Sequence, residues 1–132
     1  MGRRVNAILL DTHALLWWLE GGAKLSVRAR RTIENGDSRI FVSAATAWEI
    51  AIKHNTGKLS APDLIADFRG QLDQEGFQEL AISTNHAVRA GTIKNAHKDP
   101  FDRMLAAQAQ LEKLAIMSRD SVFDEFSVKR VW

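Results

Sequence analysis

Two aspartates each follow an apolar run that is typical of a buried strand. Asp11 follows the run 7–10, and Asp120 lies shortly beyond the run 114–117. Open α/β sheets bind their ligands outside the carboxyl ends of the strands, so both carboxylates are candidates for one site. Taken singly, Asp11 could instead be a helix N-cap and Asp120 an ordinary loop aspartate.

A third acid, Glu49, lies inside an expected helix, 44–55, that is apolar on nearly all sides. A helix with this composition is expected to be largely buried, and a buried carboxylate needs a partner. The alternative is an ordinary ion pair with Lys53, one helical turn later.

The fourth acid, Asp102, stands near the start of the expected helix 101–113. It could complete a capping box behind Asp99, with Asp in place of the usual Glu. However, Asp102 shares a helix face with Leu105 and Ala106, which belong to the apparent core stripe. A residue that serves only as a surface cap would face outward.

Carboxylates that converge on one cleft would repel each other unless a cation lay among them. Hard divalent ions such as Mg²⁺ and Mn²⁺ prefer oxygen ligands and retain bound waters. Such a site can polarise a phosphate, lower the pKa of a bound water and stabilise a leaving oxygen. The spacing of the four acids permits this convergence and does not demonstrate it.

The elements that must position these acids alternate between strand and helix. Strands are expected at 7–10, 39–42, 77–82 and 114–117, with a last edge strand at 127–131. Helices are expected at 14–20, 26–34, 44–55, 63–73 and 101–113, and a short one begins at 84 or 85 and ends at 90. This alternation predicts an α/β fold with a parallel sheet covered on both faces.

The length and composition limit the classes of protein that are possible. The chain has 132 residues, the size of one compact domain, so we expect a single domain over 1–132. It contains no cysteine, which excludes disulfides and thiolate metal ligands and fits a reducing cytoplasm. The formal charge of +2 permits binding to a polyanion without requiring it. We expect no targeting signal despite Arg3 and Arg4, and no membrane span, because charged residues interrupt the first apolar run.

Four blocks of sequence resemble the PIN-domain family, and within it the VapC-like ribonuclease toxins of toxin–antitoxin pairs. The blocks are Leu10-Asp11-Thr12-His13-Ala14-Leu15-Leu16-Trp17; Ser43-Ala44 with Trp48-Glu49-Ile50; His97-Lys98-Asp99-Pro100-Phe101-Asp102-Arg103-Met104-Leu105; and Ser118-Arg119-Asp120. The third block is the most specific, because a long string of polar and aromatic residues rarely recurs by chance.

This resemblance implies a three-layer α/β/α sandwich with a five-stranded parallel sheet in the order 3-2-1-4-5. It places an acidic site for Mg²⁺ or Mn²⁺ on Asp11, Glu49, Asp102 and Asp120, which would be both metal ligands and catalytic residues. It also implies cleavage of single-stranded RNA, neutralisation by a small cognate antitoxin protein, and a homodimer.

Other polar residues in these blocks have open roles. Thr12, Ser43 and Ser118 could orient metal-bound waters or cap helices, and Asp99 is expected mainly as a cap with a possible supporting role. Arg103 could hold phosphate or pair with an acid. His13 could be a structural histidine or a substrate contact, and His97 a loop residue or a phosphate contact.

Two other functions are compatible with parts of the pattern. A PIN-like module that binds RNA or protein without catalysis is the main alternative to the nuclease. A phosphotransfer enzyme would use Asp11 as nucleophile, but one such pattern requires a second aspartate at the position that His13 occupies.

Overall fold

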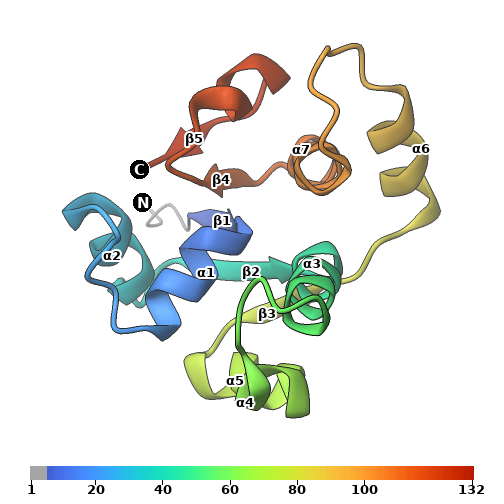
Figure 1. The fold of residues 1–132 in the computed structure, drawn as a ribbon. Coiled ribbons are helices and arrows are strands. Elements are labelled where there is room, and N and C mark those ends of the chain that lie inside the picture. Colours follow the sequence, from blue (N-terminus) through green and yellow to red (C-terminus); the bar gives the residue numbers. More distant parts are fainter. Residues whose placement is uncertain (1–5) are drawn as a thin grey trace.

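The sheet has five strands, all parallel, in the order β3-β2-β1-β4-β5 (Figure 1). A computed structural model describes residues 6–132, so Arg3 and Arg4 lie outside the described part of the chain. The strands are β1 (Ala7–Leu10), β2 (Arg39–Ser43), β3 (Gln78–Leu80), β4 (Ala115–Met117) and β5 (Arg130–Val131). The predicted α/β fold and strand order are confirmed.

The helices connect the strands and cover the sheet. They are α1 (Thr12–Leu19), α2 (Val27–Glu34), α3 (Ala44–Asn55), α4 (Pro62–Ala66), α5 (Phe68–Glu75), α6 (Thr84–Thr92), α7 (Pro100–Glu112) and the 3₁₀ helix η1 (Ser121–Phe126). In Figure 1, α6 lies outside α7, away from the sheet, and α4 and α5 lie together near β3. None of the helices in residues 6–132 is both long and apolar enough to cross a membrane.

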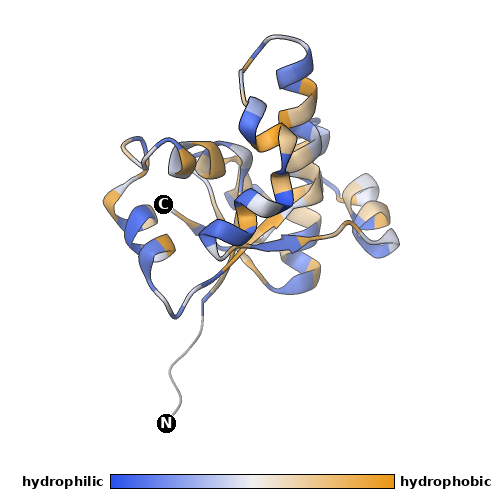
Figure 2. Cartoon of the chain, turned by 90° about the horizontal axis from the view of Figure 1, so that it is seen from below, coloured by the Kyte–Doolittle hydropathy of each residue, from blue (hydrophilic) through white to orange (hydrophobic). Residues whose placement is uncertain are grey.

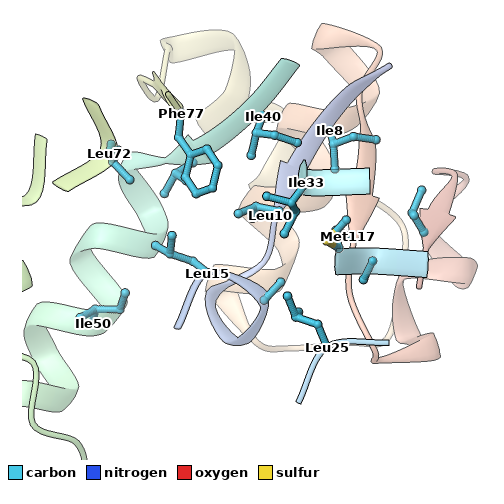
Figure 3. Packing of buried hydrophobic residues seen from close by; sticks show 14 of the residues in the cluster. Ile8, Leu10, Leu15, Leu25, Ile33, Ile40, Ile50, Leu72, Phe77 and Met117 are labelled. Atoms are coloured by element: carbon cyan, nitrogen blue, oxygen red, sulfur yellow. The ribbon is translucent and has the colours of Figure 1, made fainter. Parts of the chain in front are cut away.

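Two apolar clusters hold the layers together, because successive side chains of a strand point to opposite faces. Ile8 and Leu10 of β1 belong to one cluster with residues of α1, α2, α3 and α5 (Figure 3). Leu9 belongs to the other cluster, with residues of α7 and η1. Both faces of β1 are therefore buried, as its continuous apolar sequence predicts.

The prediction of one helix over 63–73 is wrong. The segment forms two helices that meet at Asp67, whose backbone is not helical (φ −154°, ψ 74°). The Asp67 side chain accepts a hydrogen bond of 3.0 Å from the Gly70 backbone N–H and so starts α5 as its N-cap. The capping residue Asp67 therefore divides the apolar pattern into two helices.

The bounds of other elements also differ from the prediction. The sixth helix is capped by Ser83 rather than by Thr84 or Asn85, and it continues to Thr92, into the predicted loop. The strands β3 and β5 are shorter than expected. Strand ends at the edge of a sheet are set by hydrogen-bond pairing, which the local composition does not specify.

The expectation that α3 is buried nearly all round is also wrong. Ala45, Thr46 and Ile50 are buried, but the Trp48 side chain is 60% exposed and Ile52 is 40% exposed. Figure 2 shows hydrophobic residues concentrated in the central strands, whereas hydrophobic and hydrophilic residues alternate along the surrounding helices. The outward apolar residues of α3 therefore need an explanation other than the core.

Candidate functional site, an acidic cavity at the sheet edge

The pairing of β1 with β4 brings Asp11 close to the segment that carries Asp120. Leu10 pairs with Met117, and the Asp11 backbone N–H donates to the Met117 carbonyl over 3.1 Å. The hydroxyl oxygen of Ser118, which is fully buried, accepts a hydrogen bond of 2.9 Å from the Asp120 backbone N–H. The two aspartates therefore follow neighbouring strands at the carboxyl edge of the sheet.

A cavity of about 210 Å³ is lined by the acids that the sequence predicts to converge. Its lining includes all four candidate carboxylates, together with the capping residue Asp99, and is completed by Thr12, His13, Lys53 and Phe123. Asp11 and Asp120 come from the sheet edge, Glu49 from α3, and Asp102 from the first turn of α7. The tertiary fold thus brings together acids that are more than 100 residues apart in sequence.

Asp11 is buried and also begins the helix that follows it. Its Oδ1 atom accepts a hydrogen bond of 2.8 Å from the Ala14 backbone N–H, so the N-cap of α1 is Asp11 and not the predicted Thr12. Burial raises the pKa of the Asp11 carboxyl, although hydrogen bonds from Ser118 and Ala14 act in the opposite direction. The nearby charge of Glu49 adds to the increase. A cation in the cavity would stabilise the charged form of Asp11 and so oppose this increase in its pKa.

Glu49 is held by two neighbours that occupy both of its oxygens. The buried Thr12 hydroxyl donates to Oε1 over 2.6 Å, and the Lys53 ammonium lies 2.8 Å from Oε2. Glu49 is thus partly buried and also forms the predicted ion pair with Lys53. Thr12 orients a carboxylate and does not cap α1.

Asp102 has a histidine partner. The Nε2 atom of His97 lies 2.8 Å from Oδ2 of Asp102. Burial raises the pKa of Asp102, the hydrogen bond with His97 lowers it, and the neighbouring charge of Asp99 raises it again. His97 therefore contacts an acid of the cavity rather than lying free in a loop.

Arg103 stabilises the loop that carries His97. Its guanidinium donates four hydrogen bonds of 2.7–3.1 Å to backbone carbonyls, those of Ala90, Ile93, Asn95 and His97. These bonds occupy the group, so Arg103 neither pairs with an acid nor faces the acidic cavity. Sequence reasoning could not reveal this role, because backbone carbonyls have no sequence signature.

The remaining candidates divide between helix capping and the cavity. Asp99 accepts hydrogen bonds from the backbone N–H groups of Phe101 and Asp102, at 2.8 and 3.1 Å, which confirms it as the cap of α7. Ser43 caps α3 through a bond of 2.9 Å from the Ala45 N–H and does not line the cavity. His13 is exposed, lines the cavity and packs against Trp17, so both of its possible roles stay open.

The donor set has the chemistry that Mg²⁺ or Mn²⁺ requires, namely several carboxylate oxygens around a small cavity. Within residues 6–132, however, no three acidic or histidine side chains are arranged to hold a metal ion as they stand. Glu49 is turned to Lys53 and Asp102 to His97. Binding of an ion would therefore require these side chains to turn towards a common point.

The model of the PIN domain family matches residues 8–129, nearly the whole chain. The chain belongs to the PIN domain family. This confirms the family resemblance on which the fold was predicted. A search of curated proteins found no match.

Solved structures that resemble this chain in fold include a toxin–antitoxin complex from Klebsiella pneumoniae. A chain of DNA-bound VapBC from Salmonella typhimurium is similar at 20% identity and a TM-score of 0.68, covering 96% of this chain and 97% of that one. A chain of FitAcB from Neisseria gonorrhoeae has 20% identity and a TM-score of 0.63, with 93% and 95% covered. A chain of VapBC-1 from nontypeable Haemophilus influenzae has 14% identity and a TM-score of 0.65, with 94% and 96% covered. At these identities the likeness concerns the fold.

Proposed function

We propose that this PIN domain is a Mg²⁺- or Mn²⁺-dependent endoribonuclease that acts in the cytoplasm as the toxin of a toxin–antitoxin pair. The observation that carries the proposal is the gathering of Asp11, Glu49, Asp102 and Asp120 on one cavity at the carboxyl edge of the sheet. Burial raises the pKa of Asp11 and Asp102, so the site carries an electrostatic cost that a divalent cation would offset.

In this proposal Asp11, Asp102 and Asp120 would hold the ion, with Glu49 completing the set. A bound Mg²⁺ or Mn²⁺ supplies charge that polarises a phosphate and lowers the pKa of a water. Thr12 and Lys53 orient Glu49, and His97 orients Asp102. The buried Ser118 hydroxyl holds the segment that carries Asp120 against the strand edge.

The direct test is cleavage of single-stranded RNA by purified protein. Cleavage should require Mg²⁺ or Mn²⁺, stop with EDTA, and fall by about 100-fold or more in Asp11→Asn. Asn can still cap α1, so the variant should fold. Cleavage that persists in EDTA would exclude the metal mechanism.

The main alternative is a PIN module that binds RNA or protein without catalysis. A titration of Mn²⁺ into the wild type and into Asp102→Asn distinguishes the two. A nuclease of the proposed kind should bind the ion and lose affinity in Asp102→Asn. RNA binding without metal binding or cleavage would favour the module.

The toxin proposal includes a cognate antitoxin. The similar folds in VapBC and FitAcB complexes support this partner. An antitoxin that neutralises cleavage by inserting a segment into the acidic cavity should protect Asp11 and Asp120 from solvent. A small DNA-binding protein encoded beside this gene would be the first candidate to test by co-purification.

We also propose a homodimer that uses the apolar surface of α3. A hollow of about 360 Å³ between α3, α6 and α7 is lined by Trp48, Ile82, Phe101 and Met104, among others. Trp48 and Val88 are each 60% exposed, and exposed apolar patches mark interaction surfaces. The hollow shares no lining residue with the acidic cavity, so a second copy can cover it while the cavity stays open to RNA.

A further inference from the structure

A second cavity, of about 390 Å³, adjoins the acidic cavity. The two cavities share Asp11, His13 and Asp120 as lining residues. The other walls of the second cavity are Trp17 from α1 and Arg119 with Ser121 from the segment after β4. Its volume lies within the range of about 300–1,000 Å³ that is typical of pockets for small organic ligands.

The aromatic wall of this second cavity is built from rings that pack against each other. His13 and Trp17 lie one helical turn apart on α1, with ring centroids 5.5 Å apart and planes inclined by 35°. Trp132 packs against Trp17 with centroids 5.8 Å apart, and Trp17 also packs against the apolar cluster that contains Leu10 and Leu15. A preformed aromatic surface of this kind loses little conformational freedom when another ring stacks on it.

The basic wall is provided by Arg119. Its side chain is exposed and forms no hydrogen bond or salt bridge with any residue from 6 to 132. Arg103 and Arg130, in contrast, are occupied by backbone carbonyls and by Asp124. A guanidinium that is free beside two carboxylates is suited to a phosphate or to the face of a base.

We propose that the second cavity binds the unpaired nucleobase adjacent to the scissile phosphate of single-stranded RNA. The base would stack on Trp17 and His13, and Arg119 would contact the phosphate backbone. This inference rests on the proposed RNA cleavage, because a strand whose phosphate lies in the acidic cavity places its next nucleotide across the shared wall. Aromatic platforms combined with basic groups are the usual means of binding single-stranded RNA.

The test combines a protein substitution with a change in the RNA. Trp17→Leu and Arg119→Gln should each weaken binding of a fluorescein-labelled single-stranded RNA about tenfold, in an Asp11→Asn background that prevents turnover. An RNA with an abasic site at the nucleotide beside the cleaved bond should bind the Asp11→Asn parent more weakly. Trp17→Leu should then cause almost no additional loss, because the base and the indole form one interaction.

Trp18→Leu is the matched control. The Trp18 ring packs on Phe77, and its Nε1–H donates to Glu75 over 2.7 Å, away from the second cavity. This variant should bind RNA as the parent does. If Trp17→Leu fails to fold, the exposed residues His13 and Arg119 carry the test through His13→Ala and Arg119→Gln.

The outcomes distinguish a failure of the base subsite from a failure of the proposed nuclease function. If the wild type cleaves RNA and the Trp17 and Arg119 variants bind it normally, the base subsite is wrong and the nuclease proposal stands. If these variants lose binding to an antitoxin but not to RNA, the cavity is a protein contact instead. If the wild type neither binds nor cleaves RNA, both proposals fail.

Discussion

The ammonium of Lys53 lies 2.8 Å from Oε2 of Glu49 and thus places a positive charge among five acidic residues. Without it, Glu49 would face the charges of Asp11 and Asp102 with only the Thr12 hydroxyl as a neighbour. Lys53 therefore provides part of the charge compensation that a metal ion would provide in the proposed active state.

Lys53→Met should lower the stability of the metal-free protein. The two side chains of this ion pair are 33% and 14% exposed, so we expect a loss of about 1 kcal/mol in the free energy of unfolding. The loss should shrink when Mn²⁺ is added, because the ion supplies positive charge. Urea unfolding with EDTA and with Mn²⁺ measures both values. Arg69→Met, which breaks an exposed pair with Glu79, is the control. An equal loss with and without Mn²⁺ would contradict the compensation.

Asp11→Asn should stabilise the metal-free protein at neutral pH. Burial raises the pKa of Asp11, so the folded state holds this proton more tightly than the unfolded state does. The stability of the wild type therefore falls as the pH rises through the interval between the unfolded and folded pKa values. The advantage of the Asn variant should vanish as the pH falls below that interval. Thermal unfolding in EDTA, between about pH 3 and 8, checks this, because the range begins below the ordinary pKa of an aspartate. A variant that is less stable than the wild type throughout would refute it.

His97→Ala should weaken metal binding without unfolding the protein. The histidine holds one oxygen of Asp102, and loss of such a partner of a metal ligand typically costs about 10- to 100-fold in affinity. Isothermal titration with Mn²⁺ measures the effect. His54→Ala is a control, because His54 accepts a hydrogen bond from the Ala61 N–H outside the cavity. Unchanged Mn²⁺ affinity in His97→Ala would remove His97 from the site.

Arg103→Lys should destabilise the loop that leads to α7. A lysine cannot reproduce the four hydrogen bonds of the guanidinium, and bonds to charged groups contribute about 1.5–3 kcal/mol each at most. We expect a loss of about 2 kcal/mol in unfolding free energy and faster amide exchange at Asn95 and His97. Arg89→Lys, which affects one exposed bond to Gln110, should change little. Unaltered exchange at His97 would show that the loop does not depend on Arg103.

Trp48→Ser should weaken self-association. The exposed indole packs edge-on against Phe101, with centroids 5.2 Å apart, at the hollow between α3 and α7. Sedimentation equilibrium should show a dimer for the wild type and a shift towards monomer, by about tenfold or more in Kd, for the variant. Val27→Ser, another exposed apolar position, should leave the equilibrium unchanged. Should Trp48→Ser dimerise normally and lose antitoxin binding, the surface belongs to the antitoxin.

Local patterns predicted the central elements well. The continuous apolar run 7–10 forms β1, which is buried on both faces, and the Asp99-Pro100 pair starts α7 as predicted. The predictions failed where two local signals competed, as at Asp67, which splits one apolar pattern into two helices. The predicted burial of α3 was also wrong, because an apolar composition does not reveal whether the side chains pack in the core or lie on an outer surface.

The sequence by itself determined the α/β class, the family and the four acids, because strand and helix periodicity and a specific motif depend only on neighbouring residues. Only the tertiary structure decided what those acids contact. The parallel pairing of β1 with β4 brought Asp11 to Asp120, and the packing of α1, α3 and α7 placed Thr12, Lys53 and His97 on the carboxylates. The cavity beside them, with Trp17 and Arg119 in its walls, likewise depends on long-range packing. Contacts between residues distant in sequence follow from the way whole elements bury their apolar faces, which no short stretch of sequence encodes.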